Sequence, residues 1–312
     1  MSDAFLGYLL ALGALLCFTS GILVTKVAAS RINLGLGFLI ATTTNVVFSG
    51  LAFLVQLGLR PEGLQWNAHA FWIFVAAGIF ATYFGRWFFY EAVVRFGPAK
   101  ASIFQVSSPL FTALMAWLLL GERLGPLVVA GMVLTIAGLM LVSYKPGFFA
   151  GRDPAAVGDT KHPARGYLPQ SILVLGLGSS LAYAIGNFLR GSAVRDWNEP
   201  VLGGFLGAAC GLLLHLAFTP EKRELLQRLR AASCSGVWLY ALLGTFTISG
   251  QILGIGAMRY IPMSIATLLT LCTPILVFPL SHLLFKNQED ITPVVLGGTA
   301  LTLLGIFIIV MR

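Results

Sequence analysis

Arg86 is a charged side chain in the middle of a long apolar segment that includes Tyr83 and Glu91. A charge at the centre of a bilayer costs at least ~2.5–3.5 kcal/mol on insertion scales, so Arg86 is expected to face the interior of a helix bundle. Its planar guanidinium suits a carboxylate or a phosphate group. The alternative is a structural arginine that binds Glu91 or a backbone carbonyl, and the sequence leaves both interpretations open.

Glu91 is a second charge in the same segment. On a helix that turns about 100° per residue it lies about 140° from Arg86, which disfavours a direct pair. Arg95 follows one helical turn later, and this spacing predicts a Glu91–Arg95 ion pair on the helix surface. The alternative role is a proton carrier, because carboxylates inside membranes relay protons in many transport proteins.

Further polar groups interrupt other apolar runs. Asn187 and Gln251 are the best candidates for lining a cavity, and Tyr83 and Gln105 join Arg86 and these two as predicted substrate ligands. The default role of such uncharged groups is hydrogen bonding between helices.

Lys26 and Arg190 stand near the ends of their apolar runs, where they would gate a pathway or extend to lipid headgroups. Extension to headgroups is the more common behaviour near a helix end. Pro109 and Pro274 lie inside two other apolar runs and are expected to kink both helices, as gating elements or as static packing features.

The composition indicates whether water or lipid surrounds this chain. The chain is 57% hydrophobic and 10% charged, against roughly 25% charged residues in soluble domains. Lipid must therefore cover most of the apolar surface. The net charge of +8 is explained by loop cations near anionic headgroups and predicts no nucleic-acid partner.

The apolar runs predict an all-α integral membrane protein with ten transmembrane helices, because a span needs about 20 apolar residues. The expected spans are 5–27, 34–58, 70–94, 99–120, 125–143, 168–190, 200–218, 236–258, 263–285 and 292–311.

The chain repeats itself. Arg95 and Pro98 return as Arg259 and Pro262, and Lys26 meets Arg190 at the same offset along the chain. Further pairs follow at a slightly longer offset: Glu122 with Glu289, Pro126 with Pro293, Gly131 with Gly298, and Gly138 with Gly305. Five spans per copy is an odd number, so the predicted arrangement is two inverted five-helix repeats. The copies are expected at 1–144 and 168–312, joined by a connecting loop at 145–167.

Arg86 and Glu91 are not repeated. Their counterparts, at the offset that relates Arg95 to Arg259, are Gly250 and Ile255. Residues that both copies share are expected to build the scaffold, whereas residues present in one copy are the better candidates for substrate and coupling.

The segment from Tyr90 to Ser102 resembles the junction of the third and fourth helices in EamA-type members of the drug/metabolite transporter superfamily. Pro109, the segment from Leu119 to Leu124, Gly131 and Gly138 continue the pattern, which the second copy repeats in outline. This resemblance implies a secondary transporter for a small polar metabolite such as an amino acid, with export favoured over uptake. It also implies a multi-pass protein of the cytoplasmic membrane, with both termini in the cytoplasm.

Loop charges favour the opposite orientation. Of the 20 Lys and Arg residues, thirteen fall on the side that follows odd-numbered spans and six on the other, Arg86 being inside a span. The positive-inside rule would place the termini outside, so orientation stays open.

Two other classes remain as alternatives: an integral-membrane enzyme acting on lipid headgroups or lipid-phosphate, and a non-transporting membrane scaffold. The sequence offers little for catalysis, because it has no Walker A motif and no His or Cys residues at metal-binding spacing. We expect no cofactor, no metal and no enzymatic activity. A homodimer remains open.

Overall fold

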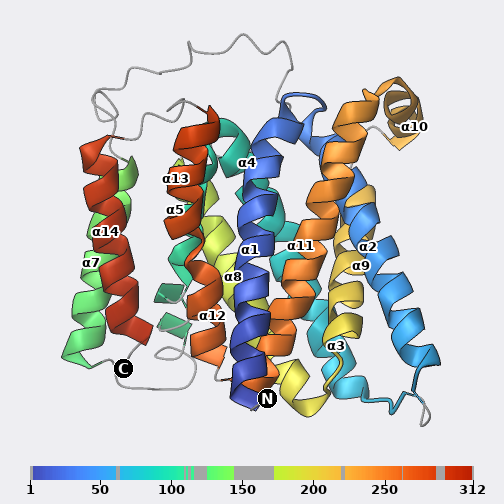
Figure 1. Ribbon diagram of the computed structural model, residues 1–312, viewed down its shortest axis with the longest axis horizontal. Helices are drawn as coiled ribbons and strands as arrows, with labels where there is room; N and C mark the ends of the chain where they lie inside the picture. The colour runs from blue at the N-terminus through green and yellow to red at the C-terminus, as the bar shows by residue number, and fades with distance from the viewer. Residues whose placement is uncertain are drawn as a thin grey trace.

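The computed structural model is a bundle of helices (Figure 1). It describes residues 3–60, 64–108, 110–111, 114–115, 125–143, 172–218, 222–261, 263–285 and 292–310. In these residues every regular element is a helix. The predicted connecting loop at 145–167 lies outside the described residues.

The helices of the first repeat are α1 (Asp3–Ala29), α2 (Leu34–Gly58), α3 (Ala68–Ala77), η1 (Gly78–Gly85), α4 (Arg86–Phe96), α5 (Pro98–Val106) and α7 (Pro126–Ser143). Those of the second are α8 (Ile172–Asp196), α9 (Pro200–Phe218), α10 (Lys222–Ala231), α11 (Cys234–Tyr260), α12 (Met263–Leu271), α13 (Thr273–Phe285) and α14 (Pro293–Val310).

Six of the described helical segments are long and apolar enough to cross a membrane: Asp3–Ala29, Leu34–Gly58, Ala68–Phe96, Leu173–Asp196, Pro200–Phe218 and Cys234–Tyr260. Three shorter apolar helices accompany them, at Pro126–Val142, Thr273–Phe285 and Pro293–Ile308. The count of ten spans stays a prediction, because much of the expected span 99–120 is outside the described residues.

Local side chains determine where several helices begin. Asn33 accepts a hydrogen bond from the backbone N–H of Leu36 at 2.9 Å, and Asn67 accepts one from that of Ala70 at 3.1 Å. Both are N-caps that satisfy a donor of the first turn. Gly97, with φ 94°, provides the sharp change of direction between α4 and α5. The corresponding Ile261 has φ −129°, so the two repeats turn with different backbones.

The helices pack in pairs that follow the internal repeat. Helix α1 packs along α11, and its counterpart α8 packs along α3, η1 and α4, which together are the counterpart of α11. Helix α2 pairs with α9, and α7 pairs with α14 at one end of the molecule (Figure 1). Equivalent helices therefore have equivalent partners.

The α7–α14 pair shows this symmetry at the level of atoms. A Cβ added to Gly138 would lie 2.5 Å from the carbonyl oxygen of Gly298, and one added to Gly305 would lie 2.6 Å from that of Gly131. Because 131 and 138 correspond to 298 and 305, each helix presents the same residues to the other in antiparallel order. Glycine permits this close backbone approach.

The α2–α9 pair is joined by polar contacts near both ends. Arg60, just beyond α2, forms an ion pair with Glu199, which precedes α9. At the opposite end the His215 Nε2 atom lies 3.0 Å from the carbonyl oxygen of Gly35.

The fourth and ninth predicted spans are interrupted at equivalent places. Helix α5 ends at Val106, and the N–H of Ser107 donates to Phe104 O at 3.1 Å. Between α12 and α13, the N–H of Cys272 donates to Leu269 O at 3.2 Å. At the offset that relates Pro109 to Pro274, Cys272 corresponds to Ser107 and Leu269 to Phe104. Pro274 therefore follows a break rather than kinking a continuous helix, and it is tolerated in the first turn of α13. Pro109 lies outside the described residues.

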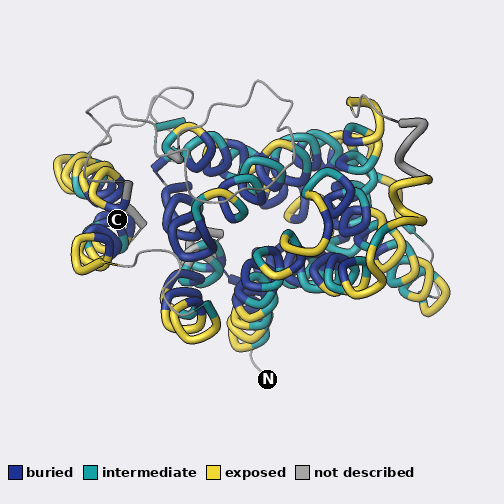
Figure 2. The backbone as a smooth tube through the Cα atoms, turned by 90° about the horizontal axis from the view of Figure 1, so that it is seen from above, coloured by how far each residue is buried: buried dark blue, intermediate teal, exposed yellow. Residues whose placement is uncertain are grey.

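Buried residues face the spaces between helices, and exposed ones lie on the outer faces (Figure 2). The exposed residues include large apolar side chains such as Leu54, Val133 and Leu283. In a bilayer these outer faces contact lipid tails.

Candidate functional site

A cavity of about 80 Å³ lies between the two repeats. Its walls come from α1, α4, α5, α8, α11 and α12, with Thr273 at the start of α13. This volume has room for several water molecules or a small solute. Apolar side chains provide much of the wall, and a few polar groups converge on it, as in most small-molecule sites.

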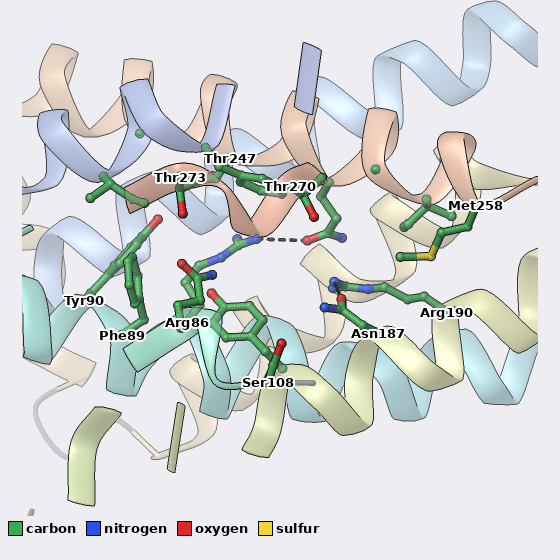
Figure 3. Close-up of a pocket in the computed structure, with 18 residues that line it drawn as sticks. Arg86, Phe89, Tyr90, Ser108, Asn187, Arg190, Thr247, Met258, Thr270 and Thr273 are labelled. Carbon is green, nitrogen blue, oxygen red and sulfur yellow. Dashed lines mark hydrogen bonds between the residues drawn. The ribbon is translucent and has the colours of Figure 1, made fainter. Parts of the chain in front are cut away.

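Arg86 is the first residue of α4, and its side chain lines this cavity. Its side chain is buried, and its Nη2 atom donates a hydrogen bond to Gln251 Oε1 at 2.9 Å (Figure 3). The burial that the sequence predicted is therefore confirmed. Gln251 belongs to the other repeat, so this contact joins the two halves across the cavity.

Asn45 on α2 holds the other side of the Arg86 guanidinium. Its amide satisfies the surrounding groups when the nitrogen donates to the carbonyl oxygens of Ala41 at 3.0 Å and Gly244 at 2.6 Å. In that orientation its oxygen accepts a hydrogen bond from Arg86 Nη1. The amide orientation follows from this network, because both carbonyls can only accept.

The segment before Arg86, η1, is a π-helix. A π-helix is wider than an α-helix, and such turns are frequent at functional sites. Small residues accommodate it: a Cβ on Gly78 would lie 2.6 Å from the Cα of Gly207, and one on Gly186 would lie 2.9 Å from the backbone nitrogen of Ala81. The sequence pattern predicted a continuous α-helix here and did not reveal this segment.

Arg190 on α8 also lines the cavity and is buried. Its Nη2 atom donates to Thr82 Oγ1 at 3.0 Å, and its Nη1 atom lies 3.5 Å from Asn187 Oδ1. Extension to lipid headgroups, the commoner behaviour for this position, is thus wrong for Arg190. The hydrogen-bonding groups of η1 and α8 hold it inside the bundle, and it does not belong among the loop cations.

Arg86, Arg190 and Tyr183 line the same cavity. In Figure 3 the two guanidinium groups extend into the pocket from opposite sides. The ion pairs among the described residues, Arg60–Glu199 and Arg95–Glu91, are elsewhere. No carboxylate contributes to the described cavity wall.

The two helix breaks supply matching polar residues to the cavity. Gln105 and Ser108 flank the first break, and Thr270 and Thr273, at the equivalent positions of the second repeat, flank the second. Thr273 Oγ1 is buried and has no hydrogen-bond partner among the residues that the structure describes. An unsatisfied buried hydroxyl is costly, so this group is available to a ligand or a water molecule.

The predicted ligands are therefore only partly brought together. Arg86, Asn187, Gln251 and Gln105 line the cavity, as does Arg190. Tyr83 does not belong to the described wall, and its ring contacts those of Phe84 and Phe218 instead.

The remaining candidates lie outside the wall. Glu91 pairs with Arg95 at 2.8 Å, which confirms the predicted surface pair. Lys26 is half-buried at the end of α1, where its Nζ atom lies 3.4 Å from Val94 O. Pro274 adjoins a wall residue without being one.

Ser108, Thr247, Thr270 and Thr273 were not predicted as ligands, although all four line the cavity. For Ser108 and Thr273 a signal was present, because each adjoins a proline that recurs in the repeat. Thr247 had none, since a threonine in an apolar helix commonly bonds to its own backbone.

This architecture, a helical bundle with apolar outer faces and a cavity of polar and apolar residues between two related halves, is that of a multi-pass membrane protein. The EamA-like transporter family model matches residues 5–144 and 170–311, so the chain belongs to that family. No curated protein matches the sequence. Among similar solved structures is a crystal structure whose alignment covers 97% of this chain and 96% of the other chain, with a TM-score of 0.58 and 18% sequence identity. At that identity the similarity supports the fold alone.

Proposed function

We propose that this EamA-like protein is a secondary transporter that exports a small polar metabolite, an amino acid or a related compound, across the cytoplasmic membrane by alternating access. The observation that carries the proposal is Arg86, a buried cation that faces a cavity at the interface of the two repeats. A buried charge of this kind is expensive and usually functional.

In this proposal Arg86 binds the acidic group of the solute, while Asn187, Gln251 and Gln105 orient it from the other walls. The guanidinium is already held by Gln251 and Asn45, so little conformational freedom is lost when the solute binds. Tyr83 is not part of this binding set.

Alternating access requires one half to move against the other around the bound solute. The matched breaks at Ser107 and Cys272 interrupt the helix hydrogen bonding beside the cavity in both halves. We assign the hinges to these two points, with Pro274 keeping the second break open. Lys26 lies near the end of α1, outside the described cavity wall, so the proposal gives it no part in gating.

Flux assays in proteoliposomes test this function. A panel of labelled amino acids and small organic acids is loaded, and initial rates of efflux are measured for the native chain and for Arg86→Ala. We expect at least one solute to move, and Arg86→Ala to lower its rate about 10- to 100-fold, which corresponds to the loss of one charged hydrogen bond.

Arg95→Ala is the matched control, since Arg95 lies on the same helix but pairs with Glu91 away from the cavity. It is expected to transport at the native rate. Absence of flux for every solute would overturn the proposed function, and flux that is indifferent to Arg86→Ala would overturn the site.

A further inference from the structure

The cavity carries an unbalanced charge. Arg86 and Arg190, from different repeats, are both buried in its wall, and each is held by uncharged partners. Gln251 and Thr82 supply hydrogen-bond acceptors but no negative charge. Neither arginine pairs with a carboxylate in the described part of the chain.

The two arginines converge on one place. Gln251, which accepts from Arg86, and Thr82, which accepts from Arg190, both lie beside Gly207 on α9. A Cβ on Gly207 would be 3.3 Å from Gln251 Nε2 and 3.2 Å from Thr82 Oγ1. The partners of the two guanidinium groups are thus separated by little more than one glycine.

Two buried like charges without a counterion are unfavourable, because each loses its hydration and repels the other. A solute with two negative charges would remove both costs. An amino acid with a neutral side chain would not, since it brings one carboxylate and an ammonium group.

We infer that the transported solute carries two negative charges on its acid groups, as a small dicarboxylate (acidic amino acids included) or a phosphate monoester, and that it is bound between Arg86 and Arg190. The hydroxyl of Thr273, which has no partner in the described part of the chain, supplies a further donor to such an acceptor-rich solute. This inference rests on the proposed transport function and specifies its substrate class.

Matched solutes that differ only in one acid group test the inference in proteoliposomes. Succinate is compared with succinamate, glutamate with glutamine, and glycerol 3-phosphate with glycerol. The assay measures flux of each labelled compound and its inhibition by the unlabelled ones. Each doubly acidic solute that is transported is expected to be preferred over its partner at least about tenfold, the value of one charge-assisted hydrogen bond.

Charge-removing variants identify which residues produce that preference. In Arg86→Gln and Arg190→Gln, the ratio of flux between the doubly acidic solute and its partner should fall toward 1. The reason is that the second negative charge of the solute no longer has a counterion in the wall. Arg95→Gln is the matched control and should keep the native preference. Retention of the native elution volume and melting temperature in detergent separates loss of selectivity from loss of folding.

The outcomes are distinguishable. Preference for succinate or glutamate assigns the site to dicarboxylates, and preference for glycerol 3-phosphate assigns it to phosphate monoesters. Flux of glutamine or succinamate at rates equal to or above those of their acidic partners overturns the inference and leaves the transport function standing. Absence of flux for every compound overturns both.

Discussion

The third span of the first repeat and α11, its counterpart in the second, are the same element built in two ways. The first is divided into α3, η1 and α4 and carries Arg86 after a π-helical segment. The second is one α-helix from Cys234 to Tyr260, with Gly250 where the first has Arg86. A wide helical segment and a buried charge thus occur together in this span of the first repeat, and both are absent from α11.

Elsewhere the two copies are alike. The breaks at Ser107 and Cys272 and the reciprocal glycine contacts between α7 and α14 fall at equivalent positions of the repeat. The comparison teaches that the two copies are alike in their packing contacts and helix breaks, whereas their contributions to the cavity wall differ.

Arg190 and Lys26 give the largest contrast, since they occupy equivalent positions but only Arg190 lines the cavity. Arg190→Gln should lower the initial rate of flux about 10- to 100-fold, because a buried charged hydrogen-bonding group is lost. Lys26→Gln should change it by less than about twofold, as expected for a half-exposed cation. Proteoliposome rates measure both. Equal losses would show that the repeats are functionally symmetric.

The α7–α14 contact predicts equal effects in the two copies. Gly138→Ala and Gly305→Ala should each destabilise the protein by about 1–3 kcal/mol, because the added methyl meets backbone atoms that cannot yield. Thermal unfolding in detergent measures the shift in Tm. Gly297→Ala is the control, since a Cβ there meets nothing within 4 Å. Unequal shifts for the two main variants would contradict the reciprocal packing.

Pro274→Ala tests the second helix break. Alanine restores a backbone donor and favours a continuous helix, so the variant should slow flux roughly two- to tenfold if the break is a hinge. The thermal stability is expected to be kept or raised. Pro279→Ala, an exposed position inside α13, should leave flux unchanged. A native rate for Pro274→Ala would remove the break from the transport cycle.

Glu91→Gln is expected to have the smallest effect. Glu91 pairs with Arg95 outside the described cavity wall, so its loss should cost at most about 1 kcal/mol of stability. Flux driven by an imposed pH gradient should be the same for the variant and the native chain. Loss of that response would identify Glu91 as the proton carrier. Glu91 would then be, like Arg86, a functional residue that the second repeat lacks.

Much of the fold could be predicted, because a helix that crosses a lipid bilayer must be apolar over its whole length, and this can be recognised in the local sequence. The apolar runs at 34–58 and 200–218 predicted the bounds of α2 and α9, and the burial of Arg86 followed from the cost of a charge in hydrocarbon. The Glu91–Arg95 pair followed from helical spacing alone. These inferences need only neighbours in the chain.

The site was harder, because it depends on which faces of distant helices meet. Asn45 and Thr82 hold the two arginines, although each looks like any polar group in an apolar run. Arg190 was expected at the headgroups, since nothing near it in the chain reveals the acceptor on η1. The π-helix also arose from packing, where glycines of α8 and α9 leave room for it.

The sequence by itself determined that this chain is a helical membrane protein with an internal repeat, since hydrophobicity, residue spacing and duplication are properties of the chain. Only the tertiary structure decided that Arg86 and Arg190, which belong to different repeats, share one cavity without a described carboxylate partner. The physical reason is that the charge balance of a buried site is set by three-dimensional contacts, which bring together helices from both repeats.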